Sequence, residues 1–310
     1  MARIIAYRSI YALILLMIAS FAVFYGMRLA PGDVADVLSS HPTGQLTVER
    51  IREDLGLNEP IFVQYFTYMG ELLRGDLGIS LINGQPIEDI LSTSVGYTLR
   101  LAALAALLSI GLAIPLGVLA AWKRNSIFDQ STMMIAVLGM GIPNFFLAVL
   151  LIQLFSVRLG WLPVAGYETP KHIIMPAIVL AAEALAINLR VVRSSMLEEL
   201  GRDYVRTLKA KGLTNNRILW VHVLRNAMPP VIALAGIMMR TLLGYTLIVE
   251  TIFRWPGLGY QLVNAVLKRD YTVAQTLAIL LTAVVILFNT LADLAQQWAD
   301  PRTREKARST

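Results

Sequence analysis

The chain has 310 residues, of which 56% are hydrophobic and 15% charged, a more apolar balance than that of soluble globular domains. This composition excludes an ordinary soluble enzyme and indicates a protein that crosses the membrane several times. The absence of cysteine and the presence of only three histidines exclude a disulfide framework and a Cys/His metal centre. The net charge of +6 does not indicate a nucleic-acid partner, because its sign changes from segment to segment, as in membrane proteins.

Six apolar segments reach the length of about 20 residues that a helix needs to cross a bilayer. The first follows Arg3 and Arg8 and has no small-residue cleavage site, so we expect a retained anchor and not a signal peptide. The predicted fold is an all-α polytopic membrane protein with six transmembrane helices and both termini on one side. The six predicted spans are about 9–29, 98–122, 131–157, 173–195, 229–253 and 274–297.

Four parts of the chain are expected from these spans. They are the N-terminal end with the first span (1–30), an external segment (31–95), a core of spans two to six with a loop at 196–228 (96–298), and a C-terminal tail (299–310). The external segment is mainly acidic, and the basic residues gather at the other ends of the spans. Because cytoplasmic loops carry the excess of Lys and Arg, we expect both termini to be cytoplasmic. The basic residues on that side are Arg3, Arg8, Lys123, Arg124, Arg202, Arg206, Lys209, Lys211, Arg217, Arg225, Arg302, Arg304, Lys306 and Arg308.

The external segment is expected to contain helices. Thr47 is a candidate cap for a short first helix, and Ile61–Leu73 is predicted to form a second helix, rich in aromatic residues. Such a helix suits the membrane interface or a position against the spans.

The ionisable residues inside predicted spans include Glu183, Arg190, Arg240 and Glu250. Each costs at least a few kcal/mol in the bilayer unless it is paired or faces water. Glu183 and Arg190 are seven residues apart and share a helix face. Three interpretations stay open: a polar substrate path, ion pairs between helices, or side chains of Arg190 and Glu250 that reach the membrane interfaces.

Glycine and proline interrupt the second and third spans, at Gly111, Pro115 and Gly117 and at Gly139, Gly141 and Pro143. Such positions supply hinges or exposed backbone along a transport path. They also serve close packing between helices, which is their commoner use.

The loop 196–228 is predicted to form a short amphipathic helix over Glu198–Lys211, ended by Gly212. Glu198 pairs with Arg202, Asp203 pairs with Arg206, and Tyr204 shares a face with Leu208. The chain is expected to re-enter the membrane at Met228-Pro229-Pro230. By its pattern, the helix lies on anionic lipid or docks on a soluble partner.

Several motifs resemble the dipeptide, oligopeptide and nickel group of ABC-importer permeases. Within the loop they are Asp203–Leu213 and His222–Pro229, and elsewhere they are Arg28–Asp33, Leu55–Pro60, Arg74–Gly78, Glu250–Gly259 and Arg269–Tyr271. Departures from the pattern are modest. Arg206-Thr207-Leu208 stand where the general importer loop has Glu-Ala-Ala, and the segment Ala292–Arg302 matches the terminal pattern only in part.

This resemblance implies a type I ABC-importer permease fold in the cytoplasmic (inner) membrane. It also implies that the loop is the coupling helix of the permease, seated on a cytoplasmic ATPase, and that Tyr204 and Leu208 form an apolar ridge toward it. His222 is interpreted as a loop residue with local hydrogen bonds. The implied coupling residues are Glu198, Arg202, Asp203, Tyr204, Arg206, Leu208, Lys209, Gly212, His222, Arg225 and Asn226, and the implied external gate loop contains Trp255, Pro256, Gly257, Gly259 and Asp270.

The chain has no Gly-rich phosphate loop ending in Gly-Lys-Ser/Thr, so it is expected to be a non-catalytic subunit that binds no cofactor. The resemblance implies a second, homologous permease in a heterodimer, two ATPase subunits that use ATP and Mg²⁺, and an external substrate-binding protein. The alternative is an ion-coupled secondary transporter, although no internal repeat is evident. An intramembrane enzyme would need clustered catalytic groups within the spans, and the sequence has no such cluster. The cargo stays open between di- or oligopeptides and nickel or a metal chelate.

Overall fold

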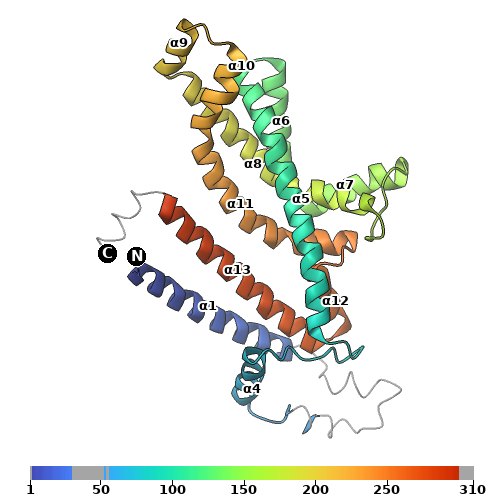
Figure 1. Cartoon of the computed structure of the whole chain (residues 1–310). Helices are drawn as coiled ribbons and strands as arrows, with labels where there is room; N and C mark the ends of the chain where they lie inside the picture. The colour runs from blue at the N-terminus through green and yellow to red at the C-terminus, as the bar shows by residue number, and fades with distance from the viewer. Residues whose placement is uncertain (1, 30–51, 54–55, 300–310) are drawn as a thin grey trace. The chain divides into compact units, whose positions relative to one another are not determined.

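The computed structural model describes residues 2–29, 52–53 and 56–299, and for some helical residues (2–9, 235–237, 239–240, 243, 288–289 and 291–299) it describes the backbone alone. The regular secondary structure of the described part is helical, and one isolated antiparallel bridge joins Ile79 and Pro86. The chain forms two compact units (Figure 1). The first comprises the chain up to Tyr97 and from Pro256 onward, and the second comprises Thr98–Trp255.

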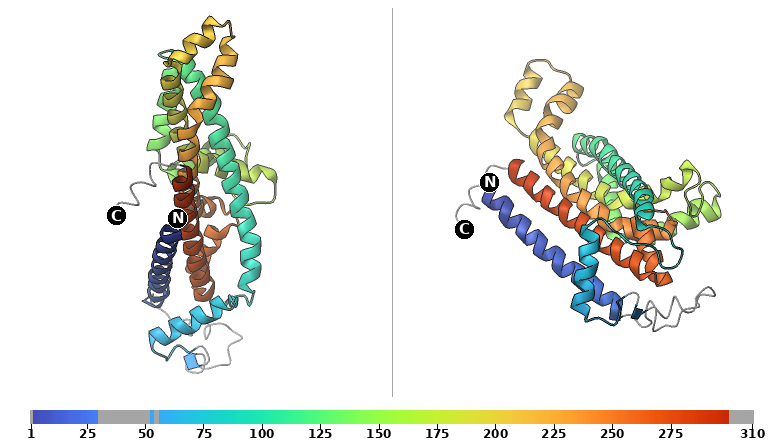
Figure 2. Two further views of the ribbon diagram at one scale, coloured as in Figure 1. Left: turned by 60° about the vertical axis from the view of Figure 1, so that its left-hand side comes forward. Right: turned by 60° about the horizontal axis from the view of Figure 1, so that its bottom comes forward.

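The first unit contains α1 (Ala2–Leu29), α4 (Ile61–Leu73), α12 (Leu258–Lys268) and α13 (Tyr271–Ala299). α1 packs beside α13, as both views in Figure 2 show, and α12 also packs on α13. The predicted helix Ile61–Leu73 is confirmed with the same bounds. The predicted cap at Thr47 lies outside the described residues.

Aromatic packing attaches α4 to α1. The Tyr65 ring lies edge-on to Phe21 and Phe24 of α1, and its hydroxyl is 2.7 Å from Ser20 Oγ. Tyr65 is 3% exposed, so α4 is anchored by a buried side chain. The arrangement agrees with the expectation that α4 lies against the spans.

The second unit contains α6 (Ile127–Gly141), α7 (Asn144–Leu151), the π-helix η1 (Ile152–Arg158), the 3₁₀ turn η2 (Pro170–Ile173), α8 (Ile174–Leu200) and α11 (Leu224–Phe253). Most of α5 (Ile87–Trp122) also belongs to it. α8 packs against α6, α7 and α11. Between α5 and α8, Asn188 Nδ2 donates to Ser109 Oγ at 3.1 Å, and both residues are buried.

Close approach of α5 to α8 takes place at Gly117. A Cβ at this position would lie 2.7 Å from Val192 Cγ1 and 3.1 Å from the Leu189 carbonyl oxygen. At Gly111, which points to a different side of α5, a Cβ would meet nothing within 4 Å. The packing interpretation therefore holds for Gly117, and α5 continues through Pro115 without a break.

The third predicted span, over 131–157, is not one continuous helix. α6 and the helix that starts at Asn144 are bent by 110° relative to each other. Pro143 disfavours helical backbone at the preceding residue, and Ile142 is extended, with φ −89° and ψ 118°. The proline therefore ends α6 and turns the chain.

Three helical segments within the described residues are long and apolar enough to cross a membrane: Ile10–Leu29, Ile87–Trp122 and Pro170–Leu200. The bent pair Ile127–Gly141 and Asn144–Arg158 makes four if it counts as one span. The apolar segments Gly244–Phe253 and Tyr271–Leu287, in α11 and α13, are shorter. The chain is thus a multi-helical membrane protein, and the count of six spans stays a prediction.

A buried ion pair joins α6 to α8. Arg193 holds Asp129 with two hydrogen bonds, Nε to Oδ1 at 2.5 Å and the second guanidinium nitrogen to Oδ2 at 2.8 Å. The Asp129 side chain is 3% exposed and also accepts the Asn125 N–H at 2.9 Å. Ser126 caps α6 by accepting the Asp129 N–H at 3.2 Å. The pair fixes the start of α6 beside the end of α8.

The substitution Gly117→Ala should lower the free energy of unfolding by about 1–3 kcal/mol, because the added methyl group overpacks the contact with Val192. The matched variant Gly111→Ala should be neutral or stabilising by up to about 1 kcal/mol, since alanine favours helix. Thermal unfolding of the detergent-solubilised protein measures both. Equal effects of the two variants would contradict the close approach.

Replacing one partner of the α6–α8 ion pair, in Asp129→Asn, should destabilise the protein by about 3 kcal/mol, because the Arg193 charge stays partly buried without its counter-charge. The exposed pair of Arg202 with Glu198 provides the control. Arg202→Gln should cost less than about 1 kcal/mol. Chemical denaturation of both variants in detergent measures the two losses of stability. Equal losses would show that the buried pair contributes no more than the exposed one.

Candidate coupling surface and translocation groove

The loop after α8 begins later than predicted. α8 continues to Leu200, and the helix that follows, α9, spans Asp203–Ala210. The expected single helix over Glu198–Lys211 is therefore wrong at its start. Arg202 has an extended backbone, with φ −74° and ψ 148°, and ends the continuity between the two helices. Glu198 lies in the last turn of α8.

The end of α9 is as predicted. Gly212 adopts φ +78°, a left-handed conformation that glycine takes without strain. Its N–H donates to the Lys209 carbonyl at 2.9 Å, and the Leu213 N–H donates to the Leu208 carbonyl at 3.3 Å. This pair of bonds is a Schellman motif, with Leu208 and Leu213 packed against the same apolar cluster. Gly212 thus ends the helix by its backbone conformation.

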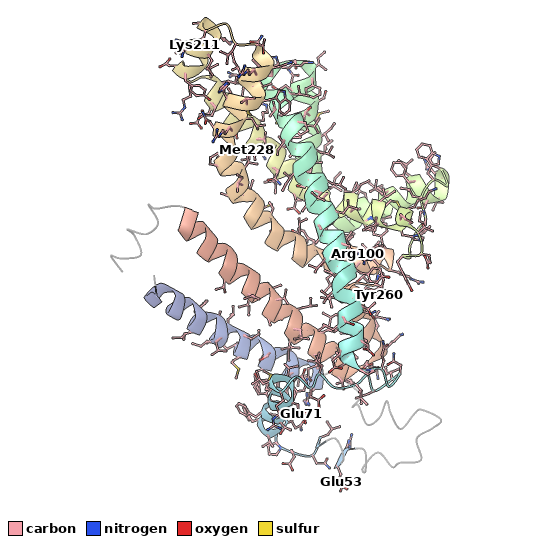
Figure 3. The ribbon with its side chains drawn as sticks, viewed as in Figure 1. Glu53, Glu71, Arg100, Lys211, Met228 and Tyr260 are labelled. Atoms are coloured by element: carbon pink, nitrogen blue, oxygen red, sulfur yellow. The ribbon has the colours of Figure 1, made fainter. Side chains whose placement is uncertain are left out.

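The chain returns to the spans as helix and not as a loop. α10 (Asn215–Arg217), the π-helix η3 (Ile218–Val223) and α11 follow one another without a gap. Figure 3 labels Lys211, which precedes this segment, and Met228, which lies near the start of α11. Both prolines of the expected re-entry point Met228-Pro229-Pro230 lie inside α11, so the helix begins before them, and the place where it enters the membrane stays a prediction.

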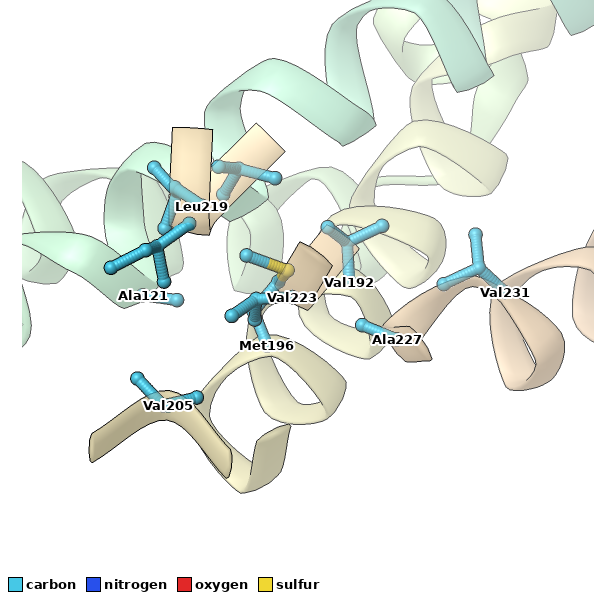
Figure 4. Close-up of a cluster of buried hydrophobic side chains, with 10 residues drawn as sticks. Ala121, Val192, Met196, Val205, Leu219, Val223, Ala227 and Val231 are labelled. Atoms are coloured by element: carbon cyan, nitrogen blue, oxygen red, sulfur yellow. The ribbon is translucent and has the colours of Figure 1, made fainter. Parts of the chain in front are cut away.

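An apolar cluster fixes α9 to the ends of the long helices of its unit (Figure 4). Its members come from α5, α8, α9, η3 and α11, and Tyr204, Leu208 and Leu213 pack against it. We call it the coupling cluster. Its buried residues are Val118, Ala121, Val192, Met196, Val205, Ile218, Leu219, Val223, Ala227 and Val231.

Polar contacts at the α8–α9 junction are local. Arg202 pairs with Glu198 at 2.9 Å and with Glu199 at 3.5 Å, and the Tyr204 hydroxyl donates to Glu199 at 2.9 Å. Burial raises the pKa of the Tyr204 phenol, and the neighbouring Glu199 acts in the same direction, so the hydroxyl keeps its proton and stays a donor. The predicted Glu198–Arg202 pair is confirmed.

The predicted Asp203–Arg206 pair is also present, but it is loose. Its N–O distance is 3.9 Å and both side chains are almost fully exposed, at 97% and 87%. Pairs of this kind contribute less than about 1 kcal/mol. Asp203, Arg206 and the exposed Lys209 are therefore free to face a partner.

Tyr204 and Leu208 do share a face, yet this face points inward. They line a pocket of about 430 Å³ between α9 and the start of α11, together with Thr207, Val221, His222, Arg225 and Asn226. The expected apolar ridge is one wall of this pocket, whose residues Val221, Arg225 and Asn226 are exposed, and its contact with a partner stays a prediction. His222 lies in η3, and its buried Nε2 finds no hydrogen-bond partner in the described part of the chain, unlike the expected local bonding.

A second groove, of about 310 Å³, lies between α6 and α8. It is lined by Arg190, Ile187 and Ser194 of α8 and by Met133 and Met140 of α6, among others. Glu183 continues the same face of α8 toward the N-terminus and is half-buried. Glu183 and Arg190 form no ion pair with each other.

The remaining charged positions within spans behave differently. Glu250 is fully buried and accepts a hydrogen bond from Thr98 Oγ1 at 2.7 Å. This contact joins α11 to α5 and favours the packing interpretation of Glu250 over a side chain reaching the interface. The side chain of Arg240 lies outside the described residues.

The residues of the expected external gate loop divide between the two units. Trp255 ends the second unit, is 5% exposed and donates its N–H to the Glu250 carbonyl at 2.9 Å. In the first unit, Pro256 is half-buried, Gly257 precedes α12 and Gly259 is buried within it. Asp270 precedes α13, accepts a hydrogen bond from Ser80 Oγ, and is 6% exposed.

The sequence interpretation missed the contacts of four polar residues: Ser80, Asp129, Asn188 and Arg193. A signal was available for Asp129, because Ser126 stands three residues before it, in a helix-start pattern. No comparable local pattern marks Ser80, whose partner is 190 residues away.

Comparison with known families covers nearly the whole chain. Residues 113–305 match the family described as "Binding-protein-dependent transport system inner membrane component". Residues 1–102 match its N-terminal companion, described as "Binding-prot-dependent transport system membrane comp, N-term".

Among curated relatives, the oligopeptide transport system permease protein AppB of Bacillus subtilis (strain 168) is 36% identical over 97% of this chain and 99% of its own length. The glutathione transport system permease protein GsiC of Escherichia coli O6:H1 is 37% identical over 94% of this chain and 95% of its own. A solved chain of the MetNI methionine ABC transporter, in an inward facing conformation, has a TM-score of 0.55 at 22% identity and covers 68% of this chain and 96% of that chain. This last likeness shows the fold.

The match to the first family alone covers more than half of the chain, and the relatives match end to end. The chain therefore belongs to the inner membrane components of binding-protein-dependent transport systems and is the non-catalytic permease subunit of an ATP-driven ABC importer, whose ATPase is a separate partner.

Proposed function

We propose that this permease carries short peptides across the cytoplasmic membrane and that α9, with the loops that flank it, receives the movement of an ATPase. The observation that carries the coupling part is the coupling cluster, which fixes α9 to the ends of α5, α8 and α11. A partner that pushes on α9 moves these helices with it, since packed interiors transmit displacement.

The surface of α9 that is available to the ATPase follows from its burial. Val205 is buried in the coupling cluster and Tyr204 and Leu208 face the pocket, so the outward face carries Asp203, Arg206 and Lys209. We expect contacts of opposite charge there, of the kind that set orientation and rate of association. Arg225 and Asn226 are exposed beside the pocket and belong to the same surface.

The assembly follows the general plan of the family. An ATPase and a substrate-binding protein work with this chain. Our proposal adds that the permease pairs with a second, homologous permease, with two ATPases on the cytoplasmic side and the binding protein on the external side. ATP and Mg²⁺ are then bound by the ATPases, and this chain binds no cofactor. The basic loop ends and the acidic segment 31–95 support cytoplasmic termini, and the loop after Trp255 is the proposed external gate.

Peptide cargo is favoured over nickel by two observations. Two of the relatives are named for oligopeptide and glutathione transport, and glutathione is itself a small peptide. In the searched part of the chain, no group of three or more His, Cys, Asp or Glu residues is placed to hold a metal ion. A metal chelate carried as an intact complex is the second candidate cargo, and it needs no ligands from the permease.

The whole proposal is tested with the complex purified through this chain. ATPase subunits and a second permease should co-purify. In proteoliposomes, the complex should take up a short peptide only when ATP is on the side of the membrane that carries the ATPases and the binding protein is on the opposite side. Uptake driven by an ion gradient without nucleotide would refute the ATP-driven assignment. Uptake of a nickel complex but of no peptide would overturn the cargo.

The coupling surface is tested by the double charge reversal Asp203→Lys/Arg206→Glu. Both side chains are exposed, so folding and membrane insertion should be unchanged, while ATP-driven uptake falls by about tenfold or more as the charges facing the ATPase are inverted. Lys171→Glu, an exposed reversal on η2, is the control and should transport normally. Native uptake by the double variant, with ATPase bound, would remove α9 from the coupling surface.

A further inference from the structure

The direction of the Arg190 side chain indicates which kind of surroundings it serves. α6 and α8 run antiparallel, because Asp129 contacts Arg193 while Gly139, ten residues later, lies beside Ala186 and Ala182. The Arg190 guanidinium is 3.4 Å from Met140 Sδ. Since Met140 stands eleven residues beyond Asp129, the Arg190 side chain extends away from the Asp129 end and toward the middle of the span.

An arginine that faces lipid at this depth would place its charge at the nearer interface. Arg190 does the reverse, although it is exposed at the surface of this subunit. Its neighbour Arg193, one turn closer to the helix end, is neutralised by Asp129. Among the described residues, the groove thus presents one guanidinium without a counter-charge, which suits a path that is filled with water or cargo.

The hydrogen-bonding capacity of Arg190 is mostly unused. A guanidinium has five N–H donors in a planar fork that matches a carboxylate. In the described part of the chain, the polar contact of Arg190 is the thioether of Met140, a weak acceptor. A carboxylate entering the groove would therefore meet donors that do not have to break a protein bond first.

A complementary charge lies on the same face of α8. Glu183, Ile187, Arg190 and Ser194 follow a spacing of three or four residues, which aligns their side chains along one stripe. Glu183 and Arg190 are separated by seven residues, or about 10 Å along the helix axis at 1.5 Å per residue. An extended peptide spans about 3.3–3.6 Å per residue, so a spacing of about 10 Å corresponds to about three residues. Because the Arg190 side chain extends along the helix toward the Glu183 end, the two charged groups suit a chain of no more than two or three residues.

From this arrangement we propose that the α8 stripe binds both ends of a zwitterionic short peptide during its passage, with Arg190 on the α-carboxylate and Glu183 on the α-ammonium group. The inference rests on the proposed peptide function and names the groups that are recognised. The groove of about 310 Å³ is lined by Arg190 and not by Glu183. Its volume lies at the lower end of the range for small-ligand sites, so the groove would hold the carboxylate end of the peptide, and Glu183 lies beyond it on the same stripe. Met133 and Met140 supply adaptable apolar walls for different side chains.

The test uses the whole importer in proteoliposomes, with its binding protein and ATP, and trialanine as the probe. Arg190→Gln and Glu183→Gln should each lower trialanine uptake by about tenfold, the effect of losing one charge-assisted contact, while ATP hydrolysis and assembly stay native. Arg190→Lys should retain more uptake than Arg190→Gln, because it keeps the charge. Arg158→Gln, an exposed arginine at the end of η1, should transport at the native rate.

Four results would overturn the inference. The first is native uptake by Arg190→Gln. The second is a loss of assembly and of ATP hydrolysis in Arg190→Gln together with its loss of uptake, which would assign Arg190 to packing. The third is a dependence on anionic lipid: the native complex loses uptake in phosphatidylcholine vesicles and regains it when phosphatidylglycerol is added, while uptake by Arg190→Gln is the same in both. Arg190 would then bind lipid. The fourth is the absence of ATP-driven trialanine uptake by the native complex, which would also remove the peptide function, whereas the first three leave that function intact.

Discussion

The packing of α9 into the coupling cluster is the contact on which the proposed mechanism depends. Each aliphatic side chain that is fully buried contributes about 1.5–3 kcal/mol, and Val205, Ile218 and Val223 are at most 3% exposed in this cluster. The ion pairs beside it are exposed, and such pairs contribute less than about 1 kcal/mol. Apolar burial therefore holds α9 in place, which leaves the charged face of α9 available for recognition.

The charged residues within the spans differ in whether the protein supplies their partners. Asp129 and Arg193 satisfy each other through two hydrogen bonds, and Glu250 is buried with Thr98 as a donor. These groups hold helices together. Arg190 is the contrasting case, because its guanidinium contacts a thioether and is accessible. A costly charge that the fold leaves without a strong partner is a candidate for binding cargo.

Local chemistry determined which features could be predicted from the sequence. The bounds of α4 follow from Pro60 and the apolar run after it, and Gly212 ends α9 because few other residues adopt φ near +78° without strain. The family, and with it the fold, followed from motifs in matching order along the chain. The start of α9 was missed because the helix formers of Glu198–Lys211 outweighed Gly201, which is the C-cap residue of α8 and is followed by the extended backbone of Arg202.

The features that could not be predicted depend on distant partners. Pro143 was noted as an interruption, but a 110° bend is set by how α7 packs on α8 and α11, which no local pattern contains. The inward orientation of Tyr204 and Leu208 has the same origin. Their spacing gives a shared face, and only the position of η3 and α11 decides that this face looks inward. For the same reason, sequence could nominate Arg190 and Glu250 together but could not separate their roles.

The start of α11 shows how movement of α9 can pass into the spans despite a weak point in the helix. Pro229 and Pro230 have no N–H, so the carbonyls of Arg225 and Asn226 lose their intrahelical donors, a situation that bends helices easily. The coupling cluster bridges this point, because Ala227 lies before the prolines and Val231 after them, and both are buried in it. Side-chain packing thus carries force across the segment where backbone hydrogen bonding is weakest. The same prolines leave the backbone carbonyls of Arg225 and Asn226 as acceptors without a helical donor next to the pocket that these two residues line. The start of α11 is therefore held by apolar side-chain packing and carries polar backbone groups at its surface.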